Sequence, residues 1–244
     1  MATYVFVHGA WLSAKCWEKV LPLIEAAGYK PVAVDYPGHG KNRDIPIEDQ
    51  SMETYTRYLV RLLSEQEEPV ILVGHSMGGM SISQASSRIP EKVKKLVYVT
   101  AFLPKSGQSC DGLENGIKPT DWRGMAKQGI GVTLDETETV SVMHEDTALA
   151  LLYNDIPAEE GKEYIKELGK ETLNAQYMAV ELGEAFARIP KAYVRCSLDT
   201  IIPPELQDKM LSDTPCEEVF TIESGHSPYH SKPRELAEVL LKLA

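Results

Sequence analysis

Apolar and polar positions follow two kinds of pattern along this chain. Short continuous apolar runs predict buried strands at residues 4–8, 30–35, 70–73 and 95–100. Between them, apolar residues recur every three or four positions, which predicts amphipathic helices at 17–27, with Gly28 as its C-cap, and at 52–65. Strands that alternate with helices in this way are typical of a mostly parallel sheet covered by helices on both faces.

The alternation stops near residue 105 and resumes near residue 187. The interval shows no apolar strand, only glycine-rich turns and helical pieces such as 146–153 and 159–168. Strands at 192–196 and 217–222, with helices at 204–211 and 233–243, then complete the pattern. Because long structureless loops are rare inside compact domains, we expect residues 105–186 to form a helical cap on a core of residues 1–104 and 187–244. The alternative is a long irregular connection.

The apolar run at 70–73 ends abruptly on Gly74-His75-Ser76-Met77-Gly78, after which apolar residues continue at helical spacing to about residue 88. A G-x-S-x-G sequence between a strand and a helix is typical of a nucleophile elbow, a sharp turn that exposes the serine hydroxyl. Gly74 and Gly78 have no Cβ to collide where the strand and helix backbones approach. The pattern therefore predicts Ser76 as a nucleophile.

A serine hydroxyl needs a base to take its proton, and the base needs a carboxylate to orient it. His226 follows the predicted strand 217–222 in Ser224-Gly225-His226, and Asp199 is the first carboxylate after the strand 192–196. The chain order Ser, Asp, His is the one expected after a nucleophile elbow. We therefore predict His226 as the base and Asp199 as its acid; the alternatives are an ordinary loop histidine and a turn or helix-capping carboxylate.

An oxyanion hole requires two backbone N–H groups, one from the residue after the nucleophile and one from the loop after the first strand. Met77 provides the first. In the loop His8-Gly9-Ala10-Trp11, Ala10 is the expected second donor, with Trp11 as the alternative.

The remaining histidines are assigned no catalytic role. We expect His8 to hold the loop by hydrogen bonding and His75 to point away from the turn and pack. His39, His144 and His230 have no partner in the pattern and are interpreted as surface or loop residues.

Within the expected cap, Trp122, Met125 and Tyr153 are the candidates for substrate contact. Their helical spacing also fits simple packing of the cap on the core. No cluster of Arg or Lys in this region singles out a phosphorylated or CoA-linked substrate.

Composition limits the possible partners and compartments. The chain has 244 residues, 43% of them hydrophobic, which suits one α/β domain with a large core. Its net charge of −11, from 36 acidic and 25 basic residues, argues against nucleic acid or an anionic membrane surface as a partner. No apolar stretch approaches the roughly 18 residues needed to span a bilayer.

The first residues run directly into a strand without a basic, then apolar, signal segment. The four cysteines, Cys16, Cys110, Cys196 and Cys216, are widely spaced, and we expect them to be reduced thiols in a cytoplasmic protein.

These motifs together resemble the α/β-hydrolase superfamily, and within it the branch of plant methylesterases, hydroxynitrile lyases and bacterial esterase relatives. The resemblance is carried by four segments: Phe6-Val7-His8-Gly9-Ala10, Val73-Gly74-His75-Ser76-Met77-Gly78-Gly79-Met80, Tyr193 to Gln207, and Gly225-His226. It implies an α/β-hydrolase fold and hydrolysis of a small or medium carboxylic ester through an acyl-enzyme, without a metal or organic cofactor. Oligomeric state stays open between a monomer and a homodimer.

The chain departs from the lyases of that branch at two positions. Those lyases carry a Thr directly after the histidine of the first strand and a Lys directly after the catalytic histidine, where this chain has Gly9 and Ser227. Without the lysine, no evident cation stabilises a departing cyanide. Other reactions of such a site (C–C bond hydrolysis, lactone opening or perhydrolysis) and a non-catalytic ligand-binding role stay as alternatives.

Overall fold

The computed structural model describes residues 2–114 and 122–244. A single six-stranded sheet forms its centre, in the order β2-β1-β3-β4-β8-β9, and every neighbouring pair is parallel. The strands are β1 (Thr3–Val7), β2 (Lys30–Val34), β3 (Val70–Ser76), β4 (Val93–Ala101), β8 (Lys191–Cys196) and β9 (Glu218–Ile222). The predicted parallel α/β sheet is therefore confirmed.

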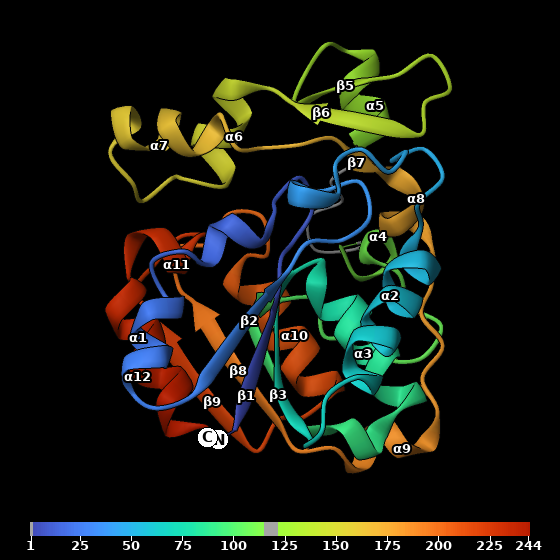
Figure 1. Ribbon diagram of the computed structural model, residues 1–244. Helices are drawn as coiled ribbons and strands as arrows, with labels where there is room; N and C mark the ends of the chain where they lie inside the picture. Colours follow the sequence, from blue (N-terminus) through green and yellow to red (C-terminus); the bar gives the residue numbers. More distant parts are fainter. Residues whose placement is uncertain (1, 115–121) are drawn as a thin grey trace.

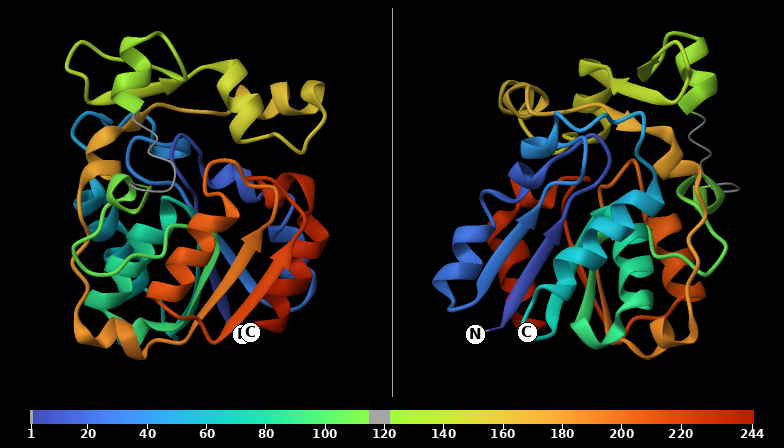
Figure 2. Two further views of the ribbon diagram at one scale, coloured as in Figure 1. Left: turned by 180° about the vertical axis from the view of Figure 1, so that it is seen from behind. Right: turned by 45° about the vertical axis from the view of Figure 1, so that its right-hand side comes forward.

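Helices cover both faces of this sheet (Figures 1 and 2). One face carries the 3-10 turn η1 (Ala14–Trp17), α1 (Leu21–Ala26), α11 (Pro228–Ser231) and α12 (Pro233–Lys242). The other carries α2 (Met52–Ser64), α3 (Gly78–Arg88), α9 (Glu184–Arg188) and α10 (Pro204–Asp213). Along β1, Tyr4 and Phe6 enter the first of these cores, while Val5 and Val7 enter the second. This alternation is what a strand buried on both sides requires.

The expected helix at 17–27 is wrong in its extent. The structure has η1 up to Trp17 and a separate helix from Leu21, with Pro22 in its first turn. Proline lacks an N–H and suits only the first turn of a helix, so Pro22 marks a start and not an interior position. Gly28 has a φ of 86° and ends the segment, as predicted.

Residues 105–186 contain strands as well as helices, which corrects the expectation of a purely helical segment. The helices are α4 (Cys110–Glu114), α5 (Trp122–Lys127), α6 (Glu145–Leu151), α7 (Ala158–Ile165), α8 (Leu173–Tyr177) and α9. A three-stranded antiparallel sheet joins β5 (Val132–Leu134), β6 (Val140–Met143) and β7 (Glu171–Thr172). Strands this short carry almost no sequence signal, because pairing with each other, and not local propensity, determines them.

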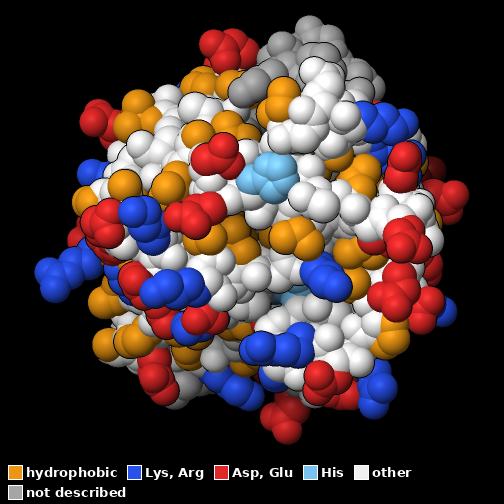
Figure 3. Space-filling view, turned by 90° about the horizontal axis from the view of Figure 1, so that it is seen from above, with side chains coloured by type: hydrophobic (Ala, Val, Ile, Leu, Met, Phe, Trp, Pro, Cys, Tyr) orange, Lys and Arg blue, Asp and Glu red, His pale blue; other side chains and the backbone are white. Residues whose placement is uncertain are grey.

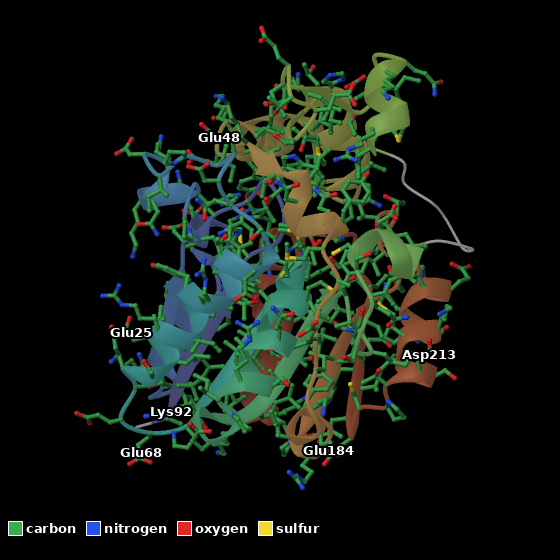
Figure 4. The ribbon with its side chains drawn as sticks, turned by 90° about the vertical axis from the view of Figure 1, so that its right-hand side faces the viewer. Glu25, Glu48, Glu68, Lys92, Glu184 and Asp213 are labelled. Carbon is green, nitrogen blue, oxygen red and sulfur yellow. The ribbon has the colours of Figure 1, made fainter. Side chains whose placement is uncertain are left out.

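The elements β5, β6, α5, α6 and α7 lie above the edge at which the parallel strands end (Figure 1). In α/β proteins that edge is where ligands bind. Seen from this side, acidic and basic side chains are interspersed (Figure 3). Charge is also spread over both ends of the molecule, since Glu48 points outward near these elements and Glu68 and Glu184 point outward at the opposite end (Figure 4).

Two further expectations concern the chain as a whole. Within the described ranges, no helix combines the length and apolarity that crossing a bilayer requires. All four cysteines are free thiols, with Cys16, Cys110 and Cys196 buried and Cys216 partly exposed.

Candidate active site

Ser76 lies in a tight turn between β3 and α3. Its φ of 53° is in the left-handed region, which is unfavourable for a residue with a side chain. The turn is possible because its neighbours are small: a Cβ on Gly74 would lie 3.0 Å from the backbone carbon of Gly78, and one on Gly78 would lie 2.7 Å from the carbonyl oxygen of His8. The conformation expected of a nucleophile elbow is therefore present.

The predicted acid and base are in direct contact. Asp199 follows β8, His226 follows β9, and His226 Nδ1 lies 2.7 Å from Asp199 Oδ2. Both residues are almost completely buried. Since an ionised carboxylate only accepts hydrogen bonds, Nδ1 donates and Nε2 is left unprotonated in the neutral ring. This is the tautomer that a general base requires.

The Asp199 carboxylate is itself fixed by the surrounding backbone. Its Oδ1 accepts hydrogen bonds from the N–H groups of Ile201 at 2.8 Å and Ile202 at 3.0 Å. Its Oδ2 accepts a further bond from Thr100 Oγ1 at 2.5 Å, at the end of β4. These three donors and His226 Nδ1 fix the orientation of the carboxylate, which in turn fixes the orientation of the His226 imidazole.

His75 links the nucleophile segment to the loop of the base. Its Nε2 lies 2.8 Å from the carbonyl oxygen of His226, and the two rings are 4.6 Å apart. The expected packing role holds as well, since the His75 ring contacts Trp17 and Tyr229 edge to face. In the described chain, Ser76 Oγ forms no hydrogen bond with His226; such bonds often tighten only when substrate binds.

The loop after β1 lies directly against the nucleophile. A Cβ on Gly9 would fall 2.6 Å from Ser76 Cβ, so only glycine allows this approach. Ala10 and Met77 line the same cavity as Ser76. The N–H of Trp11, the alternative donor, is engaged by Glu171 Oε2 at 3.2 Å.

His8 stabilises this loop in the way the sequence suggested. The N–H of Tyr36 donates to His8 Nε2 at 3.4 Å, so Nδ1 carries the proton and donates to the carbonyl oxygen of Gly9 at 2.8 Å. Burial, together with the nearby His39, lowers the pKa of His8 to about 3. The ring is therefore neutral and structural at physiological pH.

The cavity that contains Ser76 is small, at about 30 Å³. Its lining includes Trp122, as predicted, and Phe102, Asp111, Glu114, Gln176, Tyr177 and Ile201, which sequence patterns did not single out. The buried Gln176 amide nitrogen has no hydrogen-bond partner among the described residues. It is a donor left available beside the nucleophile.

Tyr153 and Met125, the other two predicted substrate contacts, are not part of the described lining of this cavity. Tyr153 instead lines a separate cavity of about 200 Å³ with Leu12, Cys16, Tyr164 and His230. The Tyr153 ring packs against Tyr164 and His230, with centroid distances of 5.7 and 5.9 Å. Helical spacing on a cap does not reveal which core surface each side chain will meet.

His39 and His144 lie in loops, as expected, whereas the interpretation of His230 as a surface or loop residue is wrong, since it lies in α11. His230 is buried and stacks on Tyr164 with 3.7 Å between ring centroids. His144 Nε2 is 2.9 Å from Thr133 Oγ1. His39 is also buried.

His39 forms a buried ion pair with Glu171. Its Nε2 lies 3.2 Å from Glu171 Oε2, although the two are not aligned as a directed hydrogen bond. Burial disfavours a charge on His39, but the adjacent carboxylate outweighs burial and raises the pKa of His39. No sequence signal pointed to this pair, which joins residues 132 positions apart.

Comparisons with known proteins agree on one family. A family model described as "Alpha/beta hydrolase family" matches residues 4–239. Methylesterase 1 of Arabidopsis thaliana is 30% identical over 99% of this chain and 95% of its own length, and methylesterase 2 of the same plant is 32% identical with the same coverage.

Solved structures give the same result. A methylesterase from Arabidopsis superposes with a TM-score of 0.82 at 26% identity, covering 100% of this chain and 98% of that one. A pyrethroid hydrolase from Sphingobium faniae superposes with a TM-score of 0.86 at 26% identity, over 99% and 96% of the two chains. The similarity therefore extends over the whole fold, including the elements above the sheet.

Proposed function

The chain belongs to the alpha/beta hydrolase family and is a carboxylic ester hydrolase, and we propose that it cleaves small or medium esters through an acyl-enzyme on Ser76. The observation that carries this proposal is the strained turn at Ser76 together with the hydrogen bond between Asp199 and His226, which follow β8 and β9.

The reaction proceeds in two halves. Ser76 Oγ attacks the ester carbonyl carbon while His226 Nε2 takes its proton, and the resulting oxyanion accepts hydrogen bonds from the N–H groups of Ala10 and Met77. The tetrahedral intermediate collapses, the alcohol leaves with the proton from His226, and an acyl-Ser76 ester remains. Water, deprotonated by His226, then attacks this ester and releases the carboxylic acid.

Asp199 stays ionised throughout the reaction and stabilises the His226 imidazolium that forms at each step. Proton transfer and acyl transfer in this scheme use side chains, backbone N–H groups and water alone. The scheme therefore calls on no metal or organic cofactor.

The relatives described above support a small alcohol group on the substrate, since they are named methylesterases. Residues 105–186 are proposed to act as a cap, since several of their elements lie above the strand ends (Figure 1). The free cysteines suit a reducing compartment such as the cytoplasm.

The test is a panel of methyl and p-nitrophenyl esters of graded acyl size, run on the native enzyme and on Ser76→Ala. We expect kcat to fall by about three orders of magnitude or more in the variant, and a fluorophosphonate probe to label only the native protein. A native protein that is not labelled and hydrolyses no ester would instead be a ligand-binding member of the fold. Labelling without ester turnover would favour lactone opening, C–C hydrolysis or cyanohydrin cleavage, to be assayed on the same pair.

A further inference from the structure

Trp11, the residue after the proposed oxyanion donor Ala10, is held almost entirely by residues that come from β6, β7 and the loop before β7. Its N–H donates to Glu171 Oε2 at 3.2 Å, and its carbonyl oxygen accepts from the N–H of Gly169 at 2.7 Å. Its indole Nε1 donates to Ser141 Oγ at 3.0 Å, and that hydroxyl donates to the carbonyl oxygen of Glu171 at 3.1 Å. Every polar group of Trp11 is therefore satisfied by this one region.

Trp11 needs such restraint, because its φ of 60° lies in the left-handed region. Residues stay in that conformation only where the surroundings fix them, and they cluster at functional sites. The Trp11 ring is additionally packed edge to face on Trp122, 5.2 Å away. Without these contacts the peptide between Ala10 and Trp11 is free to relax.

Glu171 is the centre of this arrangement. Its side chain is completely buried, and Oε1 accepts hydrogen bonds from the Tyr55 hydroxyl at 2.9 Å and from the N–H of Thr172 at 2.8 Å. Oε2 receives the Trp11 N–H and faces His39 Nε2 at 3.2 Å. A buried carboxylate is tolerated only when it is paired and hydrogen-bonded in this way, so its position is tightly determined.

We propose that Glu171 is a positioning residue for the oxyanion hole, an inference that rests on the esterase function proposed above. By holding the Trp11 N–H, Glu171 fixes the Ala10–Trp11 peptide, and through it restrains the preceding Gly9–Ala10 peptide, which carries the Ala10 N–H beside the cavity of Ser76. Because Gly9 lies directly against Ser76, a small displacement of this loop moves the donor relative to the nucleophile. The region above the sheet thereby completes the catalytic site and does more than cover it.

The decisive variant is Glu171→Gln, which keeps the size of the side chain and removes its charge and one acceptor oxygen. We expect kcat to fall about 10- to 100-fold, less than the roughly 10²- to 10³-fold loss typical when an oxyanion donor is removed outright. KM should stay within about twofold, because the donor acts on the transition state and not on bound substrate. A trifluoromethyl ketone analogue should lose affinity by the same factor as kcat, whereas the carboxylic acid product should not.

Thr172→Val is the matched control. It removes a buried hydroxyl from the same strand. That hydroxyl donates to the carbonyl oxygen of Gln50 at 3.3 Å and accepts the N–H of Asn174 at the start of α8 at 3.3 Å, and it forms no bond with Trp11. Its kcat and analogue affinity should stay near those of the native enzyme. Glu171→Asp, which restores the charge at a shorter reach, should recover part of the lost kcat.

Three outcomes would overturn the inference. The first is a folded Glu171→Gln enzyme with native kcat; the second is one in which KM alone rises. If that variant does not fold, Glu171→Asp takes its place, since it keeps the buried charge but shortens its reach to the Trp11 N–H, and a native kcat there is the third. Failure of the proposed function is distinguishable, because the native protein would then show neither ester turnover nor probe labelling.

Discussion

His75 Nε2 lies 2.8 Å from the main-chain carbonyl oxygen of His226, so the residue before the nucleophile directly holds the residue proposed as base. A carbonyl oxygen only accepts, which places the proton of His75 on Nε2. Burial and the nearby His226 ring keep the pKa of His75 well below its ordinary value, and the ring is therefore neutral. This contact joins the end of β3 to the loop after β9, although the two residues are 151 positions apart in the sequence.

Replacing His75 tests that contact. His75→Phe retains a ring for packing on Trp17 and Tyr229 but leaves the buried His226 carbonyl without a donor, at a cost of about 1–3 kcal/mol. We expect unfolding to begin at lower temperature and kcat to fall roughly tenfold, as a small misplacement of the base costs at least that much. Steady-state kinetics and thermal denaturation measure both effects.

Tyr229→Phe is the control for this prediction. It removes a hydroxyl from the same loop, 3.1 Å from Ser227 Oγ, without touching the His226 carbonyl. Its kcat should stay within about twofold of native. Equal losses in the two variants would mean that general loosening of the loop, and not the His75 contact, controls the rate.

The unpartnered amide of Gln176 predicts a preference within the substrate class. Gln176→Leu should not lower thermal stability, because it removes a buried polar group that lacks a hydrogen bond in the described structure. It should reduce kcat/KM about 2- to 10-fold for esters whose acyl group carries a hydroxyl or carbonyl acceptor, the value of one neutral hydrogen bond. Plain alkyl esters of equal length should be unaffected.

Pairs of matched esters, one with and one without the acceptor, separate this effect from a general change in the cavity. An equal loss on both members of each pair would contradict the assignment of Gln176 to substrate recognition. The carboxylates of Asp111 and Glu114 line the same cavity, so neutral esters are the appropriate pairs.

His230 makes the stability of the protein sensitive to acid. Burial, and secondarily the positive charge of Lys19, lowers its pKa to about 3 in the folded state, although Glu160 opposes the shift. At pH 7 the ring is neutral in both states and contributes nothing. As the pH falls below about 6.5 the unfolded chain binds a proton that the folded chain does not, so stability decreases from there toward pH 3.

His230→Phe should therefore flatten the decline of the melting temperature between pH 6.5 and 4, while the stacking on Tyr164 is kept. At pH 7 the variant should be at least as stable as the native protein, because His230 Nδ1 is buried without a partner in the described structure. His8 and His75 have lowered pKa values for the same reason, so part of the acid sensitivity should persist. An unchanged decline in the variant would show that His230 is not a source of it.

Much of the core was open to sequence reasoning because its signals are local. Each strand of the main sheet is a largely apolar run, and five consecutive residues, Gly74 to Gly78, encode the turn at Ser76. Asp199 and His226 were found from their positions after successive strands, since parallel strands end at one edge of a sheet. The contact between those two side chains then follows from the order of β8 and β9.

The region above the sheet was less predictable, because its elements depend on contacts that are not local in the sequence. Its strands have two to four residues, too few for a period to appear, and they exist because they pair with each other. Met125 and Tyr153 have the same apolar character as Trp122, yet only Trp122 is part of the described lining of the cavity at Ser76. Which of three similar side chains reaches the nucleophile depends on the packing of helices, which no local pattern encodes.

The sequence by itself determined the sheet, the turn at Ser76 and the placement of Asp199 and His226 after successive strands, because hydrophobic period and turn chemistry act between near neighbours. Only the tertiary structure decided that Glu171 is paired with His39 and takes the N–H of Trp11, 160 positions away. A buried carboxylate is stable only where distant donors converge on it, and that convergence is a property of the folded chain.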